Sequence, residues 1–213
     1  MNITHPLAQQ YVEKYSSPED VILKEIAEFT YNHHAHPHML SGHLQGKLLE
    51  TISRMVQPNR VLEIGCFTGY SAICLAAGLK DKGLLHTIEL READAAIAAG
   101  YINRTVYANQ IKIHIGEAVK IIGELDEFWD LVFIDADKEN YINYFNLVID
   151  KVRPNGFILA DNVLFHGQVL EEEIKGKNAK AIQAFNDFIQ LRNDVEKLML
   201  PVRDGLYILR KLL

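Results

Sequence analysis

The sequence predicts an α/β protein with a mostly parallel sheet of seven strands, and three features of the chain support that fold class. From Arg60 onward, short apolar runs alternate with helical patterns, as in consecutive β–α–β units. Two of these runs, 131–134 and 157–160, are apolar at every position, which is typical of strands buried on both faces. The last two runs are separated by Pro201 and Asp204-Gly205, which predicts an antiparallel hairpin at the C-terminus.

The first 58 residues carry helical patterns and no strand pattern. Short helices are expected over 5–16 and 44–56. Between them, Ser17-Pro18-Glu19-Asp20 predicts another helix start, with Ser17 as the capping residue and Pro18 in the first turn. We therefore expect one domain over 1–213, made of a helical N-terminal segment, 1–58, and an α/β core, 59–213.

The core elements follow from the positions of apolar runs and turn residues. Strands are expected at 60–64, 84–89, 111–115, 131–134, 157–160, 195–200 and 205–211. Helices are expected at 69–78, 91–107, from 117, at 140–152 and at 171–193. Pro154-Asn155-Gly156 predicts a turn that leads into the fifth strand.

Composition narrows the class of protein. The chain has 213 residues, is 48% hydrophobic, and carries a formal net charge of −6. That acidity disfavours a nucleic-acid partner, which usually meets a basic face. Cys66 and Cys74 lie in a strand–loop–helix pattern and indicate reduced thiols rather than a disulfide framework. No secretion signal or membrane-spanning run is recognisable, so we expect a cytoplasmic protein without a membrane partner.

A histidine tract runs from His33 to His43 and includes His34, His36 and His38. Such a tract has the side chains for a transition metal. However, Pro37 interrupts it, and the irregular spacing matches no closed site with a fixed ligand set. A polar loop near the ligand is the favoured interpretation.

Polar residues follow the two uniformly apolar strands, at the point where each strand ends. Asp135 and Lys138 follow the first, and Asp161 and Asn162 follow the second. Ligands of open α/β sheets bind beyond the carboxyl ends of the strands, so neighbouring strands would bring these side chains together. Their oxygen atoms suit a divalent cation such as Mg²⁺ or Ca²⁺. Loop starts and helix caps explain the same residues equally well at this point.

The first strand–helix turn reads Glu63-Ile64-Gly65-Cys66-Phe67-Thr68-Gly69-Tyr70-Ser71. Glycines in such a turn let the backbone approach a ligand closely. A dinucleotide-binding loop would need a further glycine beside the pyrophosphate, so the turn argues against NAD. Glu89 ends the next strand about twenty residues later, where an acid that binds ribose hydroxyls is expected. A nucleoside cofactor without phosphates, such as S-adenosylmethionine, fits better.

At this level of detail the chain resembles the cation-dependent O-methyltransferases, the family of the caffeoyl-coenzyme A and catechol O-methyltransferases. The likeness extends from about Met39 to the C-terminus. It rests on Glu63-Ile64-Gly65-x-x-Thr68-Gly69-Tyr70-Ser71, Asp135-Ala136-Asp137-Lys138-x-Asn140-Tyr141, Asp161-Asn162-x-Leu164-x-x-Gly167 and Leu200-Pro201-x-x-Asp204-Gly205. The resemblance implies a Rossmann-like class I methyltransferase fold, with N-terminal helices that act as a lid and in dimerisation. It also implies methyl transfer from S-adenosylmethionine to a hydroxyl of a catechol-type small molecule.

The resemblance also implies roles for individual residues. The metal ligands are expected to be Asp135, Asp161 and Asn162, and the catalytic residues Lys138 and Asp135. The cofactor-binding residues are expected to be Ser41, Glu63, Gly65, Cys66, Ser71, Glu89, Ala118 and Asp137. The substrate-contacting positions are expected to be Met39 and His166. His166 departs from the Asn that is common in the plant enzymes, which puts the plant substrate in doubt.

The expected chemistry fits these residues. A phenol has a pKa near ~10, so a chelated divalent cation that favours the anion would promote its attack on the sulfonium methyl group. Lys138 would position or accept the proton, since a lysine near a cation becomes a usable base when its pKa falls.

Other functions remain open from the sequence. One is O-methylation of a 5-hydroxyuridine in transfer RNA, which a basic patch around Arg104, Lys175, Lys177 and Lys180 would favour. Two less favoured alternatives are a NAD-binding Rossmann oxidoreductase and a non-catalytic ligand-binding module. The resemblance further implies a homodimer.

Overall fold

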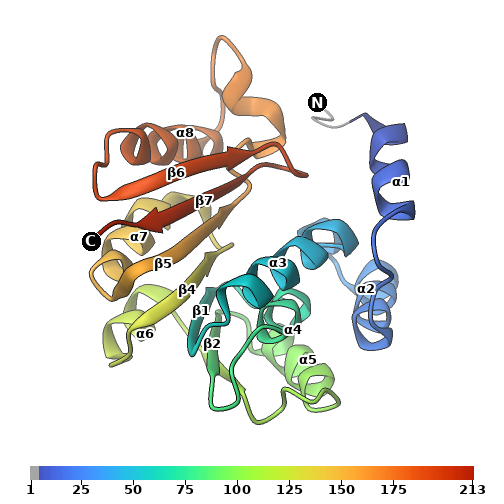
Figure 1. The fold of residues 1–213 in the computed structure, drawn as a ribbon. Coiled ribbons are helices and arrows are strands. Elements are labelled where there is room, and N and C mark those ends of the chain that lie inside the picture. The colour runs from blue at the N-terminus through green and yellow to red at the C-terminus, as the bar shows by residue number, and fades with distance from the viewer. Residues whose placement is uncertain (1–4) are drawn as a thin grey trace.

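The computed structural model describes residues 5–213 and contains one seven-stranded sheet. The strands are β1 (Arg60–Ile64), β2 (Leu84–Glu89), β3 (Ile111–Ile115), β4 (Trp129–Ile134), β5 (Val152–Asp161), β6 (Val195–Leu200) and β7 (Leu206–Lys211). Their order across the sheet is β3-β2-β1-β4-β5-β7-β6 (Figure 1). The first five strands pair in parallel, whereas β7 is antiparallel to both β5 and β6. The predicted fold class, including the C-terminal antiparallel hairpin, is confirmed.

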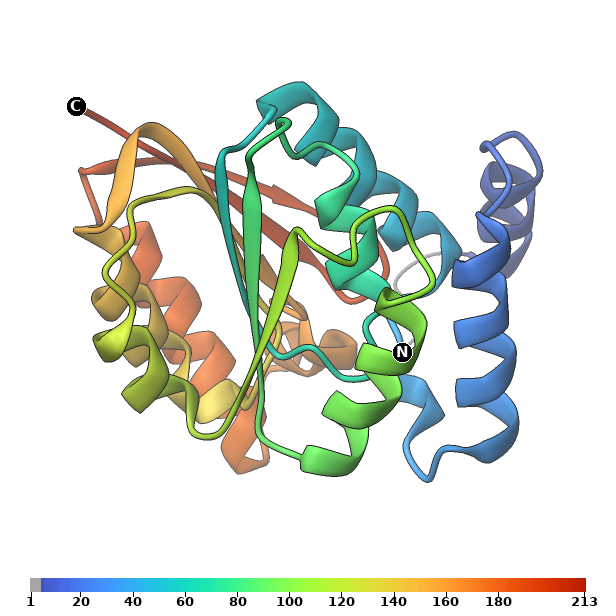
Figure 2. The same cartoon turned by 90° about the horizontal axis from the view of Figure 1, so that it is seen from below.

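Helices cover both faces of this sheet, so that it forms the middle layer in Figure 2. The α-helices are α1 (Pro6–Lys14), α2 (Val21–His33), α3 (His43–Val56), α4 (Tyr70–Ala76), α5 (Glu92–Ile102), α6 (Ala118–Glu124), α7 (Tyr141–Ile149) and α8 (Lys177–Gln190). Short 3₁₀ helices are η1 (Pro37–Met39), η2 (Lys138–Asn140) and η3 (Phe165–Leu170). Helices α3, α4 and α5 cover one face and α6, α7 and α8 the other, while α1 and α2 lie outside the first layer (Figure 2).

Alternation along the strands produces two hydrophobic cores. In β1, Val61 packs into the core beneath α3–α5, whereas its neighbour Leu62 packs into the core beneath α6–α8. Leu131 and Val132 divide between the two cores in the same way in β4. Successive side chains of a strand point to opposite faces, so strands covered on both faces must be apolar throughout. This explains the uniformly apolar runs of the sequence.

The direction of the chain across the sheet changes at β1, which has β2 on one side and β4 on the other. Helix α4, which follows β1, and helix α7, which comes after β4, lie on opposite faces of the sheet (Figure 2). Such a switch point opens a crevice beyond the carboxyl ends of the strands. The residues that follow β1, β4 and β5 therefore converge on one place.

Several predicted element boundaries are wrong. Asp20, not Ser17, caps α2, because its carboxylate accepts the N–H of Ile22 at 2.9 Å. The helix expected over 171–193 covers only Lys177–Gln190, and the 3₁₀ helix η3 precedes it. The turn expected at Pro154-Asn155-Gly156 lies inside β5, next to a register irregularity in its pairing with β4.

Among residues 5–213, no helix is both long enough and apolar enough to cross a lipid bilayer.

Candidate active site

A cavity of about 970 Å³ lies beyond the carboxyl ends of β1, β2, β4 and β5 and is also lined by the segment around η1. It lies in the size range of small-molecule sites. All but one of the predicted site residues line it. Those that do are Met39, Ser41, Gly65, Cys66, Ser71, Glu89, Ala118, Asp135, Asp137, Lys138, Asp161, Asn162 and His166. The exception is Glu63.

Gly65 brings the ends of β1 and β4 together. Its φ is +100°, and a Cβ atom at this position would lie 2.0 Å from the carbonyl oxygen of Asp135. Any side chain here would push the backbones of the two loops apart. The N–H groups of Gly65 and Cys66 both reach the carbonyl oxygen of Ile88, at 3.0 and 3.1 Å. These bonds fix the turn against β2.

Glu89, the predicted ribose acid, is held by backbone bonds. Its Oε2 accepts the N–H of Phe67 at 2.7 Å, and its Oε1 accepts the N–H of Arg91 at 3.0 Å. A carboxylate has about four lone-pair sites, so two more donors can still bind. The position therefore fits a pair of vicinal ribose hydroxyls.

Glu63 does not line the cavity and is fully buried. Its Oε2 accepts the hydroxyl of Thr87 at 2.5 Å, and its Oε1 has no hydrogen-bond partner among residues 5–213. Burial raises the pKa of Glu63 to about 8, against the hydrogen bonds from Ser71 and Thr87, and the charges of Asp135 and Glu89 raise it further. Ser71, which hydrogen-bonds to Glu63, does line the cavity.

The other predicted cofactor-binding residues occupy distinct parts of the wall. Cys66 is buried, and burial raises the pKa of its thiol well above the usual value, so its backbone is the part suited to contact a ligand. Asp137 accepts the hydroxyl of Tyr144 and, at 2.6 Å, the side-chain amide of Asn140. These two donors set the orientation of the Asp137 carboxylate.

Asp135 and Asp161 crowd negative charge at the ends of β4 and β5. Burial raises the pKa of Asp161 well above its ordinary range, and the charge of Asp135 raises it further, while Lys138 and a bond from Gln45 lower it. Oδ1 of Asp161 is buried and has no hydrogen-bond partner in the described part of the chain. Two carboxylates and the neighbouring Asn162 form an oxygen-rich donor set that fits a divalent cation.

Lys138 connects the two acids. Its Nζ donates to Oδ1 of Asp135 at 3.0 Å and to the Tyr141 hydroxyl at 2.7 Å. Tyr141 in turn donates to the carbonyl oxygen of Asp161 at 3.1 Å. Burial lowers the pKa of Lys138, but Tyr141, Asp135 and Asp161 together raise it above its ordinary value. The two carboxylates therefore stabilise the ammonium form, and a cation held by them would compensate the charge that does so.

Sequence reasoning missed two residues that hold Asp161. Gln45 of α3 is buried and donates its side-chain amide to Oδ2 of Asp161 at 2.7 Å. Its carbonyl oxygen accepts from Arg203 at 3.0 Å, and Arg203 also donates to the backbone carbonyl of Ser41. Position 203 lies inside the Leu200-Pro201-x-x-Asp204-Gly205 motif as an unspecified residue, and Gln45 had no signal beyond its helix.

The predicted substrate positions frame the outer part of the cavity. Met39 ends η1 and is half exposed. His166 follows β5 in a left-handed stretch, with φ of 56°, and its N–H donates to the Asp204 carboxylate. Asn162 is also left-handed, with φ of 57°, and such strained backbone collects at functional sites.

Two other sequence hypotheses lose support. Arg104 follows α5 and pairs with Glu25, whereas Lys177 begins α8, on the opposite face of the sheet, and pairs with Glu139. Arg104 therefore lies on a different face of the sheet from Lys177. In residues 5–213, no three His, Cys, Asp or Glu side chains form a group suited to a metal ion, which includes the tract from His33 to His43.

The family model described as O-methyltransferase matches residues 13–212. The chain belongs to the O-methyltransferase family. A catechol O-methyltransferase of Niastella koreensis is 34% identical over 162 residues, which cover 74% of this chain and 73% of that protein. Caffeoyl-CoA O-methyltransferase 5 of Nicotiana tabacum is 29% identical, with 89% of this chain and 84% of that protein covered.

Solved structures of O-methyltransferases superpose closely on this one. TomG from Streptomyces achromogenes, an enzyme of tomaymycin synthesis determined in complex with SAM, has a TM-score of 0.88 and 29% identity. The match covers 97% of this chain and 96% of TomG. The SAH-bound methyltransferase PaMTH1 from Podospora anserina has a TM-score of 0.89 and 27% identity, with 96% and 94% of the two chains covered. This O-methyltransferase thus shares its fold along nearly its whole length with enzymes that bind this cofactor pair.

Proposed function

We propose that this O-methyltransferase transfers the methyl group of S-adenosylmethionine to one hydroxyl of a catechol-type small molecule, with a divalent cation bound by Asp135, Asp161 and Asn162. The observation that carries the proposal is the buried Asp161 carboxylate. It has one oxygen without a partner, lies under the charge of Asp135, and lines the same cavity as Gly65 and Glu89.

The cofactor assignment rests on the ribose end of the cavity. Glu89 keeps lone pairs for two hydroxyls, and Gly65 lets a ligand lie against the backbone. The solved relatives TomG and PaMTH1 carry SAM and SAH. The missing pyrophosphate glycine argues against NAD and hence against an oxidoreductase.

The residues around Asp161 define the expected chemistry. A divalent cation bound there would act as a Lewis acid toward the substrate oxygens and favour the anionic hydroxyl. With the carboxylate charges compensated by that cation, Lys138 would accept the hydroxyl proton and then hold the anionic oxygen by a hydrogen bond. Asp135 positions Lys138 through their 3.0 Å contact. Holding two reactants in line supplies on the order of 7–11 kcal/mol in favourable cases.

The substrate class rests on the relatives and on the donor set. Two of the relatives are named for catechol and for caffeoyl-CoA. Two adjacent oxygens on one ring suit chelation at a site that already has three protein oxygens. His166 and Met39, at the mouth of the cavity, are the positions at which we expect substrates to be distinguished.

A homodimer is the expected assembly. Helix α1 has no buried residue, and its apolar side chains Leu7, Tyr11 and Val12 are exposed, as is the following Tyr15. An apolar helix that the monomer leaves uncovered favours burial against a second copy.

The test is methyl transfer from labelled S-adenosylmethionine to a caffeoyl-type catechol, with Mg²⁺ and with EDTA. We expect turnover with Mg²⁺ and its loss with EDTA. A matched monohydroxy phenol serves as the control, since it lacks the second oxygen for chelation. Turnover unaffected by EDTA would contradict the cation, and turnover only on transfer RNA would replace the substrate class.

A further inference from the structure

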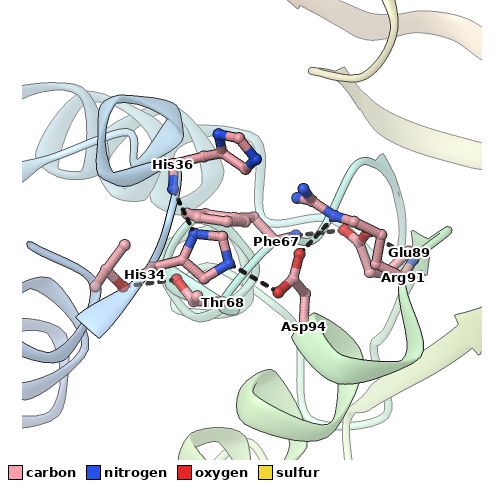
Figure 3. A network of polar contacts seen from close by, with 8 residues as sticks. His34, His36, Phe67, Thr68, Glu89, Arg91 and Asp94 are labelled. Atoms are coloured by element: carbon pink, nitrogen blue, oxygen red, sulfur yellow. Dashed lines mark hydrogen bonds and ion pairs between the residues drawn. The ribbon is translucent and has the colours of Figure 1, made fainter.

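His34 has both of its ring nitrogens engaged although it does not line the cavity. It caps the C-terminal end of α2, and its Nδ1 accepts the backbone N–H of His36 at 3.0 Å (Figure 3). An accepting Nδ1 carries no proton, so the proton of the neutral ring is on Nε2. Nε2 lies 3.0 Å from Oδ1 of Asp94 and therefore donates to it.

Asp94 links His34 to Arg91, which lies beside Glu89. It lies in the first turn of α5 and is 4% exposed. Its Oδ2 lies 2.6 Å from Nε of Arg91, which is itself 3.6 Å from Oε1 of Glu89. The Asp94 carboxylate is buried and needs a charged partner, so it holds the guanidinium of Arg91, which is 39% exposed, on the side toward Glu89.

Phe67 lies inside the same cluster. Its ring meets the ring of His34 edge-on, with centroids 4.6 Å apart, and the Arg91 guanidinium lies 5.6 Å from its centroid (Figure 3). Phe67 has a φ of +50°, which is strained for an aromatic residue. Contacts on both sides of the ring hold the backbone in this conformation, and its N–H is the one that binds Glu89.

The cluster also attaches one end of the segment that crosses the cavity. Residues 34–42 contain η1 with Met39, and Ser41 near the far end is held by Arg203. A buried bond between Thr30 and Thr68, at 3.2 Å, ties α2 to the turn beside His34. The segment is thus fastened at the ribose end by His34 and at the carboxylate end by Arg203.

We propose that His34 is a positioning residue for S-adenosylmethionine, acting through Asp94 and Arg91 on Glu89 and Phe67. The bond from Nε2 to Asp94 fastens the cavity-crossing segment, 34–42, to the wall that receives the ribose. This role rests on the proposed cofactor function and adds to it the residue that organises the ribose end.

Two substitutions test the roles of the two ring nitrogens of His34 separately. His34→Asn keeps an acceptor at the Nδ1 position but cannot reach Asp94, whereas His34→Gln keeps an amide donor at the Nε2 position. We expect His34→Asn to raise the Kd for S-adenosylmethionine and its KM about tenfold, with kcat changed less than about twofold. His34→Gln should stay within about threefold of the wild-type Kd. His33→Asn, at the exposed neighbouring position, is the matched control and should not change it.

Hydrogen exchange and a double-mutant cycle complete the test. In His34→Asn, amides of residues 34–42 should exchange faster than in wild type or His34→Gln, with or without cofactor. In an Asp94→Ala background, His34→Asn should add no further loss of affinity, because the hydrogen bond between His34 and Asp94 is already absent. Equal effects of Asn and Gln, additive losses, or an unchanged Kd with only a lower Tm would overturn the role. Absence of cofactor binding by the wild-type protein would instead remove the proposed function.

Discussion

At the ribose end of the cavity, Glu89 accepts two backbone N–H groups, at 2.7 and 3.0 Å, one on each carboxylate oxygen. At the opposite end, Asp161 accepts one amide from Gln45 through Oδ2 while its Oδ1 has no partner within residues 5–213. The neighbouring charge of Asp135 adds to the imbalance and raises the pKa of Asp161. The chain supplies a partner to each oxygen of Glu89, whereas at Asp161 it leaves one buried oxygen without a partner and compensates the two acids only in part, through Lys138.

The two ends of the cavity therefore depend on different properties: backbone geometry at the Glu89 end and charge at the Asp161 end. The ribose end is built from backbone geometry that exists without a ligand, so it depends on Gly65, Phe67 and the packing around them. The carboxylate end costs folding free energy until positive charge binds, and a cation that binds only the folded state would return that free energy as stability. Changes at the two ends should therefore affect different measurements.

Removing the carboxylate of Asp161 should have the largest effect. We expect Asp161→Ala to lower turnover by more than about a hundredfold, because a ligand of the proposed cation and one of the two buried charges are lost together. The Kd for S-adenosylmethionine, measured by calorimetry, should change less than about threefold. Asp161→Asn is the control that keeps the shape. Unchanged turnover in Asp161→Ala would contradict the metal assignment, whereas the Asn variant keeps an oxygen that can still bind the cation.

Lys138→Met should lower turnover by roughly a hundredfold while cofactor affinity stays within about threefold, since the lysine contacts Asp135 and Tyr141 rather than the ribose end. Without its ammonium group, Asp135 and Asp161 repel each other uncompensated. The variant should therefore lose stability in EDTA and regain part of it with Mg²⁺, as followed by thermal unfolding. Equal losses of turnover and of cofactor affinity would remove the proposed catalytic role.

The sequence was sufficient for the fold and for the residues that follow the strands. Uniformly apolar strands and alternating helices specify a parallel sheet, and the strand ends then place Asp135 and Asp161 at one edge without any knowledge of packing. Helix ends were less predictable. The helix expected over 171–193 begins only at Lys177, because Gly176, with φ of 87°, has a non-helical backbone immediately before it.

The residues that support the site could not be predicted, for a physical reason. Gln45 lies 116 positions from Asp161 in the sequence, and His34 lies 60 positions from Asp94. Contacts of this kind depend on how α2 and α3 pack against the sheet, which leaves no local pattern. The resemblance placed Glu63 among cofactor contacts, and its burial away from the cavity lining became apparent only from the structure.

Gln45→Leu should produce a smaller change than either substitution above. Loss of the 2.7 Å bond leaves Asp161 free to turn and Arg203 without its side-chain partner. Outer partners of metal ligands are typically worth 10–100-fold in metal affinity. We expect a loss of that order in Mn²⁺ affinity, measured by electron paramagnetic resonance, with Thr51→Ala on the exposed face of α3 as the control. Unchanged Mn²⁺ affinity would mean that Asp161 is held by the backbone alone.

Glu63→Gln should change turnover least. Its effect on stability tests whether Asp135 and Glu89, at the two ends of the cavity, both act on Glu63. Burial, and to a smaller extent the charges of Asp135 and Glu89, raise the pKa of Glu63 to about 8 in the folded protein, against 4.5 in the unfolded chain. The unfolded chain therefore loses this proton first as pH rises, so the wild-type free energy of unfolding should fall relative to the Gln variant between about pH 4.5 and 8. The difference should reach a few kcal/mol.

Urea unfolding of both proteins in EDTA, from pH 5 to 9, measures this difference. The curves should converge at the acidic end and separate toward pH 8, with the Gln variant the more stable. Because Glu63 does not line the cavity, the Kd for S-adenosylmethionine should change less than about threefold. Parallel stability curves would mean that Glu63 is ionised in the fold, and a large loss of affinity would make it a direct cofactor contact. If Asp161→Asn changes the pH dependence of this stability difference, the charge of Asp161 also acts on Glu63.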